Sequence, residues 1–89
     1  MPPKQYEVVI KLVRNNRPCH FGHQIGDEWI FNYATPSGMC GLAFNALYPV
    51  ALSLLYGNSF PWQPDPDVAM VSCPDVDVQN IFELRRREK

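Results

Sequence analysis

Residues 39–56 read MCGLAFNALYPVALSLLY, and no charged side chain occurs among them. Leucine and alanine are the commonest residues of this stretch, and Gly57 and Asn58 follow it as a helix stop signal. Ser37 is placed to act as the N-cap. Pro49 lies inside the run, so it should kink the helix or begin a second one. The stretch therefore predicts one apolar helix, possessing a kink or a restart at Pro49.

The apolar side chains of this helix cover every face rather than one stripe. A helix that packs on a sheet needs an apolar stripe on one side only. The other side then needs a second cover, which a sister subunit related by a two-fold axis would supply. We therefore expect a homo-oligomer, most simply a dimer, formed through residues 39–56. A membrane span is the competing interpretation, but Asn45, Ser53 and Pro49 argue against it.

Strand patterns flank the helix on both sides. Residues 6–12 alternate apolar and polar side chains, and residues 28–33 are rich in aromatic side chains. After the helix, residues 68–73 form a short apolar run, and residues 80–86 alternate again. The predicted fold is α+β with the order ββαββ, in which a small, mainly antiparallel sheet packs on one helix. Residues 1–89 form a single domain in this prediction.

The composition limits the classes of function that the chain can have. A net charge of −1 offers no basic surface for nucleic acid or for anionic lipid. The one basic run lies in residues 85–89, which we interpret as a solvated C-terminal tail. The odd number of cysteines and the lack of a signal-peptide pattern favour reduced thiols and a cytoplasmic protein.

Three cysteines and one histidine are the most suggestive side chains for chemistry. Cys19 and His23 share one loop, Cys40 lies at the start of the predicted helix, and Cys73 ends the third strand. Three thiolates and one imidazole are a known tetrahedral zinc set, and such a site would stabilise a small domain. We therefore predict a metal-binding protein in which zinc or iron is held by four ligands: Cys19, His23, Cys40 and Cys73.

Two other interpretations of the same residues stay open. Near a helix N-terminus, Cys40 would feel the positive end of the helix dipole, which favours the thiolate. With His23 as its base, Cys40 could then serve a thiol-dependent enzyme or a small-ligand-binding protein. Alternatively, the three cysteines are core residues, and the protein is a self-associating interaction module.

The order of short motifs along the chain resembles a family of short prokaryotic proteins that have no settled biochemical function. The motifs are CxxGHxxGDE at residues 19–28, GxCxxAxxALxP at 38–49, YGxSxPW at 56–62, CPD at 73–75 and FELRR at 82–86. The resemblance implies that the three cysteines and His23 belong to a shared pattern. It implies no particular metal, substrate or partner.

Overall fold

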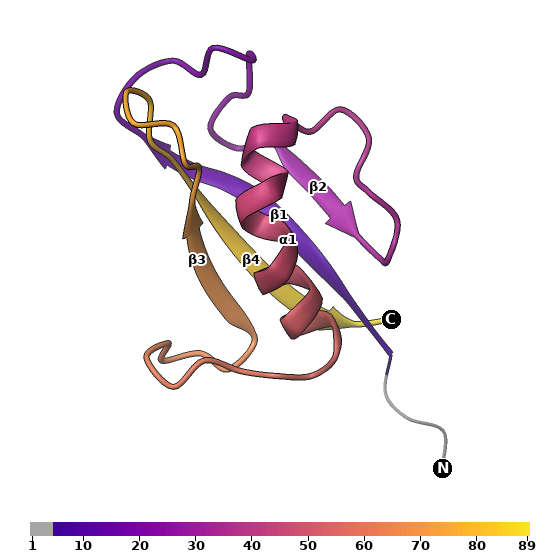
Figure 1. The fold of residues 1–89 in the computed structure, drawn as a ribbon. Helices are drawn as coiled ribbons and strands as arrows, with labels where there is room; N and C mark the ends of the chain where they lie inside the picture. The colour runs from indigo at the N-terminus through magenta and orange to yellow at the C-terminus, as the bar shows by residue number, and fades with distance from the viewer. Residues whose placement is uncertain (1–4) are drawn as a thin grey trace.

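The protein, seen here in a computed structural model, is described for residues 5–89, so the first four residues of the predicted domain lie outside the described part. The elements are β1 (Tyr6–Asn15), β2 (Glu28–Phe31), α1 (Gly41–Leu55), β3 (Val68–Ser72) and β4 (Asn80–Glu88). The strands form one antiparallel sheet in the order β2-β1-β4-β3, and α1 lies across one face of it (Figure 1). The predicted α+β fold and its ββαββ order are confirmed.

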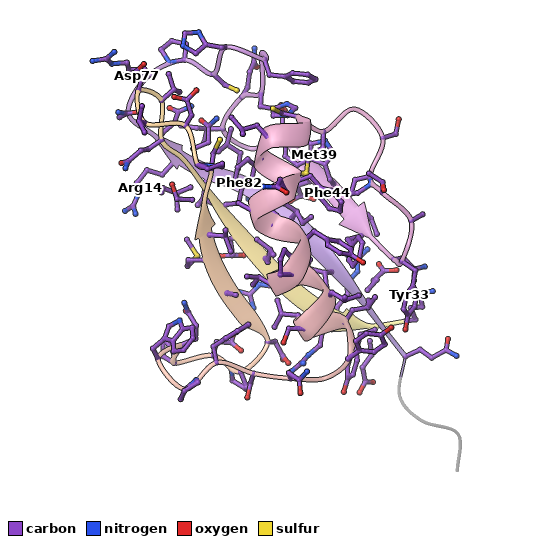
Figure 2. All side chains as sticks on the ribbon, viewed as in Figure 1. Arg14, Tyr33, Met39, Phe44, Asp77 and Phe82 are labelled. Atoms are coloured by element: carbon purple, nitrogen blue, oxygen red, sulfur yellow. The ribbon has the colours of Figure 1, made fainter. Side chains whose placement is uncertain are left out.

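Alternation along the two central strands gives the sheet one apolar face. Ile10 and Leu12 of β1 are fully buried, and the register places them beside Leu84 and Phe82 of β4. Because side chains alternate across a strand, these four side chains point to the same face of the sheet. That face carries α1, and Figure 2 labels Phe82 beside the helix.

A single stripe of α1 is buried against the sheet. Four of its buried residues recur at every third or fourth position, namely Ala43, Leu47, Ala51 and Leu54, and the fifth, Leu55, adjoins the last of them. Pro49 lies on the opposite, exposed side and provides no N–H for the carbonyl of Asn45. Because Asn45 is also exposed, water can replace that hydrogen bond. Pro49 therefore neither ends α1 nor divides it.

The start of α1 differs from the sequence prediction. The N-cap residue is Cys40 rather than Ser37, and its side chain makes no capping hydrogen bond. The Cys40 carbonyl accepts the first helical hydrogen bond from the N–H of Phe44, at 2.9 Å. Ser37 therefore lies before the helix and does not cap it.

The basic run at the C-terminus is part of the sheet. β4 continues to Glu88 and pairs with β1 along this run. Arg86 shares the inward-facing parity of Leu84 and is buried. The sequence suggested residues 85–89 as a solvated tail, but residues 85–88 of this run are strand, because the alternation of β4 continues through the arginines.

Candidate functional site: a thiol-lined cavity

Three segments that are distant in the sequence meet at the end of the molecule where α1 begins. The connection between β1 and β2, residues 16–27, and the connection between β3 and β4, residues 73–79, both reach this end (Figure 1). In Figure 2, Asp77 marks the same end, and Tyr33 marks the opposite one. The cysteines and the histidine singled out from the sequence all come from these segments.

A cavity of about 320 Å³ lies between the three segments. Its wall includes the four residues that the sequence singled out: Cys19, His23, Cys40 and Cys73. Asn80 also lines it, and apolar side chains complete much of the wall: Phe21, Leu42, Ala43 and Val78. Folding thus brings three thiols and one imidazole to a single, largely apolar cavity, which is the setting in which small-molecule sites are usually found.

The turn that carries Cys19 surrounds its sulfur with hydrogen-bond donors. The Gly22 N–H donates to the Cys19 carbonyl at 3.0 Å, and Gly22 has a φ of 102°, which glycine tolerates. Burial alone would raise the pKa of the Cys19 thiol, but hydrogen bonds to its sulfur outweigh burial and hold the pKa below its ordinary value. The donors are the N–H groups of His23 and Phe21, the Asn80 amide and the N–H of Gly22. Successive N–H groups of this kind form an anion-binding nest, which here favours the thiolate.

His23 joins this turn to the start of α1. Its Nε2 accepts a hydrogen bond from the backbone N–H of Cys40 at 3.0 Å, and its ring lies 4.7 Å, between centroids, from the rings of Phe21 and Trp29. Burial lowers the pKa of His23, and the nearby Asp27 carboxylate opposes this effect only in part. His23 is therefore neutral near pH 7 and acts as a helix cap. The sequence analysis paired His23 with Cys40 as base and thiol. The hydrogen bond between them is made by the Cys40 backbone N–H and not by its thiol.

Cys73 directly follows β3 and is the most buried of the three thiols. Its backbone N–H donates to the Asn80 carbonyl at 2.8 Å, which fixes it beside β4. Burial raises the pKa of the Cys73 thiol; a hydrogen bond from the Asp75 backbone opposes the rise, and the charges of Cys40, Asp75 and Cys19 add to it. Cys73 therefore favours the protonated form.

Asn80 is a site residue that the sequence analysis missed. It is the first residue of β4 and only 3% exposed, and its side-chain amide donates to the Cys19 sulfur. Among residues 5–89, its buried Oδ1 atom has no hydrogen-bond partner. The alternation of β4 in the sequence could have identified Asn80 as an inward-facing residue, because it has the same parity as Phe82 and Leu84 and must point inward with them.

The predicted metal ligands share a cavity without forming a metal cluster. Within residues 5–89, no group of three or more His, Cys, Asp or Glu side chains is arranged to hold a metal ion. The Nε2 atom of His23, one potential ligand atom, already accepts the Cys40 N–H. Zinc or iron binding by these residues therefore stays a prediction.

Comparison of the chain with protein-family models, with curated proteins and with solved structures gave no match. The family resemblance drawn from the motifs accordingly stays a prediction, and function has to be argued from the cavity. In the part of the chain that the structure describes, no helix has both the length and the apolar character that crossing a membrane requires.

Proposed function

We propose that the protein is a thiol-dependent small-ligand protein, in which the Cys19 thiolate attacks an electrophilic carbon of a ligand held in the cavity. The observation that carries this proposal is the set of hydrogen-bond donors around the Cys19 sulfur, at the wall of a largely apolar cavity. The thiolate, and not the thiol, is the nucleophilic form of cysteine. In the reaction a carbon–sulfur bond forms, and the bond to the leaving group breaks with its electron pair departing on that group.

This proposal moves the reactive group from Cys40 to Cys19. The lone pair on Nε2 of His23, which a base would use, is engaged by the Cys40 backbone. Cys19 needs no such base, because the surrounding N–H groups already favour its ionised form. In this scheme His23 holds the Cys19 turn against α1, while Cys40 and Cys73 form the wall of the cavity.

Alkylation by iodoacetamide, followed for each cysteine by mass spectrometry, tests the proposal. We expect Cys19 to be labelled first, with a rate that rises through a midpoint below the ordinary pKa of a cysteine thiol. Cys73 should be labelled last, because burial raises the pKa of its thiol and limits access to it.

Serine variants of the three cysteines are matched controls for this experiment. Cys19→Ser should abolish the fast phase of labelling, whereas Cys40→Ser and Cys73→Ser should keep it. Faster labelling of Cys40, or equally slow labelling of all three thiols, would contradict the proposal.

A second candidate function, the binding of zinc or iron, is favoured by one observation. The negative charges of Cys40 and Cys19 both raise the pKa of the Cys73 thiol, so the three sulfurs would repel one another once ionised. A bound cation would relieve that repulsion, and thiolate ligands suit zinc and iron. His23 would supply the fourth ligand only by releasing the Cys40 N–H.

Metal analysis of protein purified without a histidine tag tests the second candidate. About one equivalent of zinc or iron for each chain, lost in the Cys40→Ser and Cys73→Ser variants, would support it. Metal-free protein that folds normally, and that binds neither ion on titration, would exclude it.

We also propose that the protein forms a dimer through the outer face of α1, which we define as Leu42, Asn45, Tyr48, Pro49 and Tyr56. All five residues are exposed, and none carries a charge. The uncharged character extends to the whole stretch between Glu28 and Asp65, so two copies can approach here without charge repulsion. A cytoplasmic location belongs to the same proposal, because a reactive thiolate persists in a reducing compartment.

A further inference from the structure

One edge of the sheet is left open along β3. Within residues 5–89 this strand pairs with β4 alone, and Figure 1 shows no other labelled element along its outer side. An open edge invites pairing with another chain, so proteins usually protect it with charged side chains, prolines or bulges. Val68–Ser72 has none of these, whereas β2, the other edge, is shorter and begins with the charged Glu28. The β3 edge is therefore unprotected.

The hydrogen bonds at the two ends of β3 show which of its backbone groups face this edge. The Arg86 N–H donates to the Asp67 carbonyl at 2.7 Å, and the Cys73 N–H donates to the Asn80 carbonyl at 2.8 Å. In an antiparallel ladder, every second residue bonds to the neighbouring strand. Residues of odd number in this stretch therefore face β4. The residues whose N–H and carbonyl groups point to the free edge are Val68, Met70 and Ser72.

Most of these edge-facing groups have no partner in the described part of the chain. The Val68 N–H donates to the Asp65 carbonyl at 3.2 Å. Within residues 5–89, no other backbone hydrogen bond engages the Val68 carbonyl or the N–H and carbonyl groups of Met70 and Ser72. Met70 and Ser72 are exposed, so a partner can reach them. Donors and acceptors that alternate along an extended strand match the backbone of another extended chain.

Charges at both ends of β3 indicate a partner other than a second copy of the same strand. Two aspartates precede β3, Asp65 and Asp67, and two follow it, Asp75 and Asp77. If two copies of β3 paired antiparallel, the start of each would lie beside the end of the other, so aspartates would meet aspartates. Like charges brought together in this way oppose the pairing. A segment with basic side chains at its ends would meet the same aspartates favourably.

The two faces of β3 specify the side chains between those ends. Val71 shares the parity of Phe82, so it points to the α1 side of the sheet, where it is half-buried. Met70 lies opposite Glu83 on the other face, where it is exposed. A strand added beside β3 continues both faces of the sheet. It therefore needs apolar side chains on the α1 side and polar side chains on the other side.

We propose that β3 binds an extended segment of another protein as an additional antiparallel strand, in which apolar and polar side chains alternate between basic ends. The antiparallel direction follows the three strand pairs already present in the sheet. This peptide-binding edge does not use the Cys19 thiol, so the inference goes beyond the proposed function and stands independently of it.

Two N-methylated forms of one synthetic peptide test the proposal. The parent sequence, Lys-Val-Thr-Val-Thr-Val-Lys, has valines on one face and basic ends. In antiparallel pairing, two residues that exchange hydrogen bonds lie directly opposite one another, with their side chains on the same face. The threonines therefore bond to β3 when the valines cover the α1 side. N-methyl groups on both threonines remove these donors, whereas N-methyl groups on two of the valines leave them.

We expect the valine-methylated peptide to bind at least about tenfold more tightly than the threonine-methylated one, because the latter loses hydrogen bonds of about 1 kcal/mol each. NMR titration measures both affinities. The bound peptide should also slow the exchange of the Met70 and Ser72 N–H groups with solvent. The N–H groups of Ala69 and Val71, which already bond to β4, should exchange as before.

Two substitutions of Met70 separate the backbone contact from the side-chain contact. Met70→Pro removes an N–H that faces the free edge and takes no part in the ladder with β4, a position at which an edge strand tolerates proline. It should weaken binding of the valine-methylated peptide by about tenfold, whereas Met70→Ala keeps the N–H and should weaken it by less than about threefold. Cys19→Ser should bind the peptide as the unaltered protein does.

Each outcome decides one proposal. Equal affinities of the two methylated peptides, or no binding of either, would overturn the peptide-binding edge. Protection of the Met70 and Ser72 N–H groups that rises with protein concentration, in the absence of peptide, would overturn it in favour of a second copy of the chain. Slow labelling of Cys19, with the peptide preference intact, would overturn the proposed function alone. If Met70→Pro fails to fold, the two peptides on the unaltered protein still decide.

Discussion

Arg86 shows how a single residue connects the parts of this small domain. Its guanidinium donates to the carbonyls of Leu54 and Asn58, at 3.1 and 2.8 Å, and pairs with the Asp67 carboxylate at 2.9 Å. It also lies over the ring of Tyr6, 4.9 Å from the ring centroid. The end of α1, the following loop and the two central strands are thus joined at one cation, which also suits the negative end of the helix dipole.

Replacing Arg86 should therefore destabilise the protein far more than replacing its neighbour. We expect Arg86→Met to lower the free energy of unfolding by about 2–4 kcal/mol, because buried carbonyls lose their donor. Arg85→Met removes an exposed ion pair with Asp65 and should cost less than about 1 kcal/mol. Urea denaturation of both variants measures the difference. Equal losses in the two variants would show that Arg86 does not join α1 to the sheet.

At the scale of elements, the start of α1 depends on the protonation state of His23. Its Nε2 can accept the Cys40 N–H only while the ring is neutral, and the pKa of His23 is lowered in the folded protein. The unfolded chain takes up this proton near pH 6.5, and the folded protein does so only at lower pH. The stabilisation is therefore complete above about pH 6.5 and is lost as the pH falls from there through the folded pKa. His23→Gln should remove this part of the pH dependence of unfolding, and His20→Gln, at an exposed position, should retain it. An identical pH profile for His23→Gln and the unaltered protein would contradict the capping role.

The elements themselves could be predicted from the sequence, but the links between them could not. Strand alternation and the apolar helix are local patterns, so the ββαββ order followed from residues close together in the chain. The hydrogen bond from Cys40 to His23 spans 17 positions and has no sequence signature, which is why Ser37 seemed the better cap. The same limit applies to the site. The cysteines could be singled out by residue type, but which thiol favours ionisation depends on where the N–H groups after Cys19 point.

At the scale of the whole molecule, the prediction to test is that the outer face of α1 packs against a second copy of the chain. We place the two-fold axis of the proposed dimer at Asn45, which lies between Leu42 and Pro49 on the helix surface because residues three and four apart are neighbours. In a dimer with two-fold symmetry, residues near the centre of the interface face their own copies. A charge introduced at position 45 would therefore meet the same charge on the second subunit. We expect the unaltered protein to be a dimer, and Asn45→Glu and Asn45→Lys each to be a monomer, as measured by size-exclusion chromatography with light scattering.

Mixing the two charged variants turns this prediction into a test of geometry rather than of stability. A glutamate on one subunit and a lysine on the other attract, so the mixture should dimerise although neither variant does so alone. Gln79→Glu, which adds a charge at an exposed position outside α1, should leave the dimer intact. Dimers that survive both single substitutions would place the interface on another surface, and a monomeric unaltered protein would leave the outer face of α1 without a partner subunit. Association that returns only in the mixture would show that the outer face of α1 is the interface and that the dimer has two-fold symmetry. Only a residue that faces its own copy makes two like charges repel and two opposite charges attract.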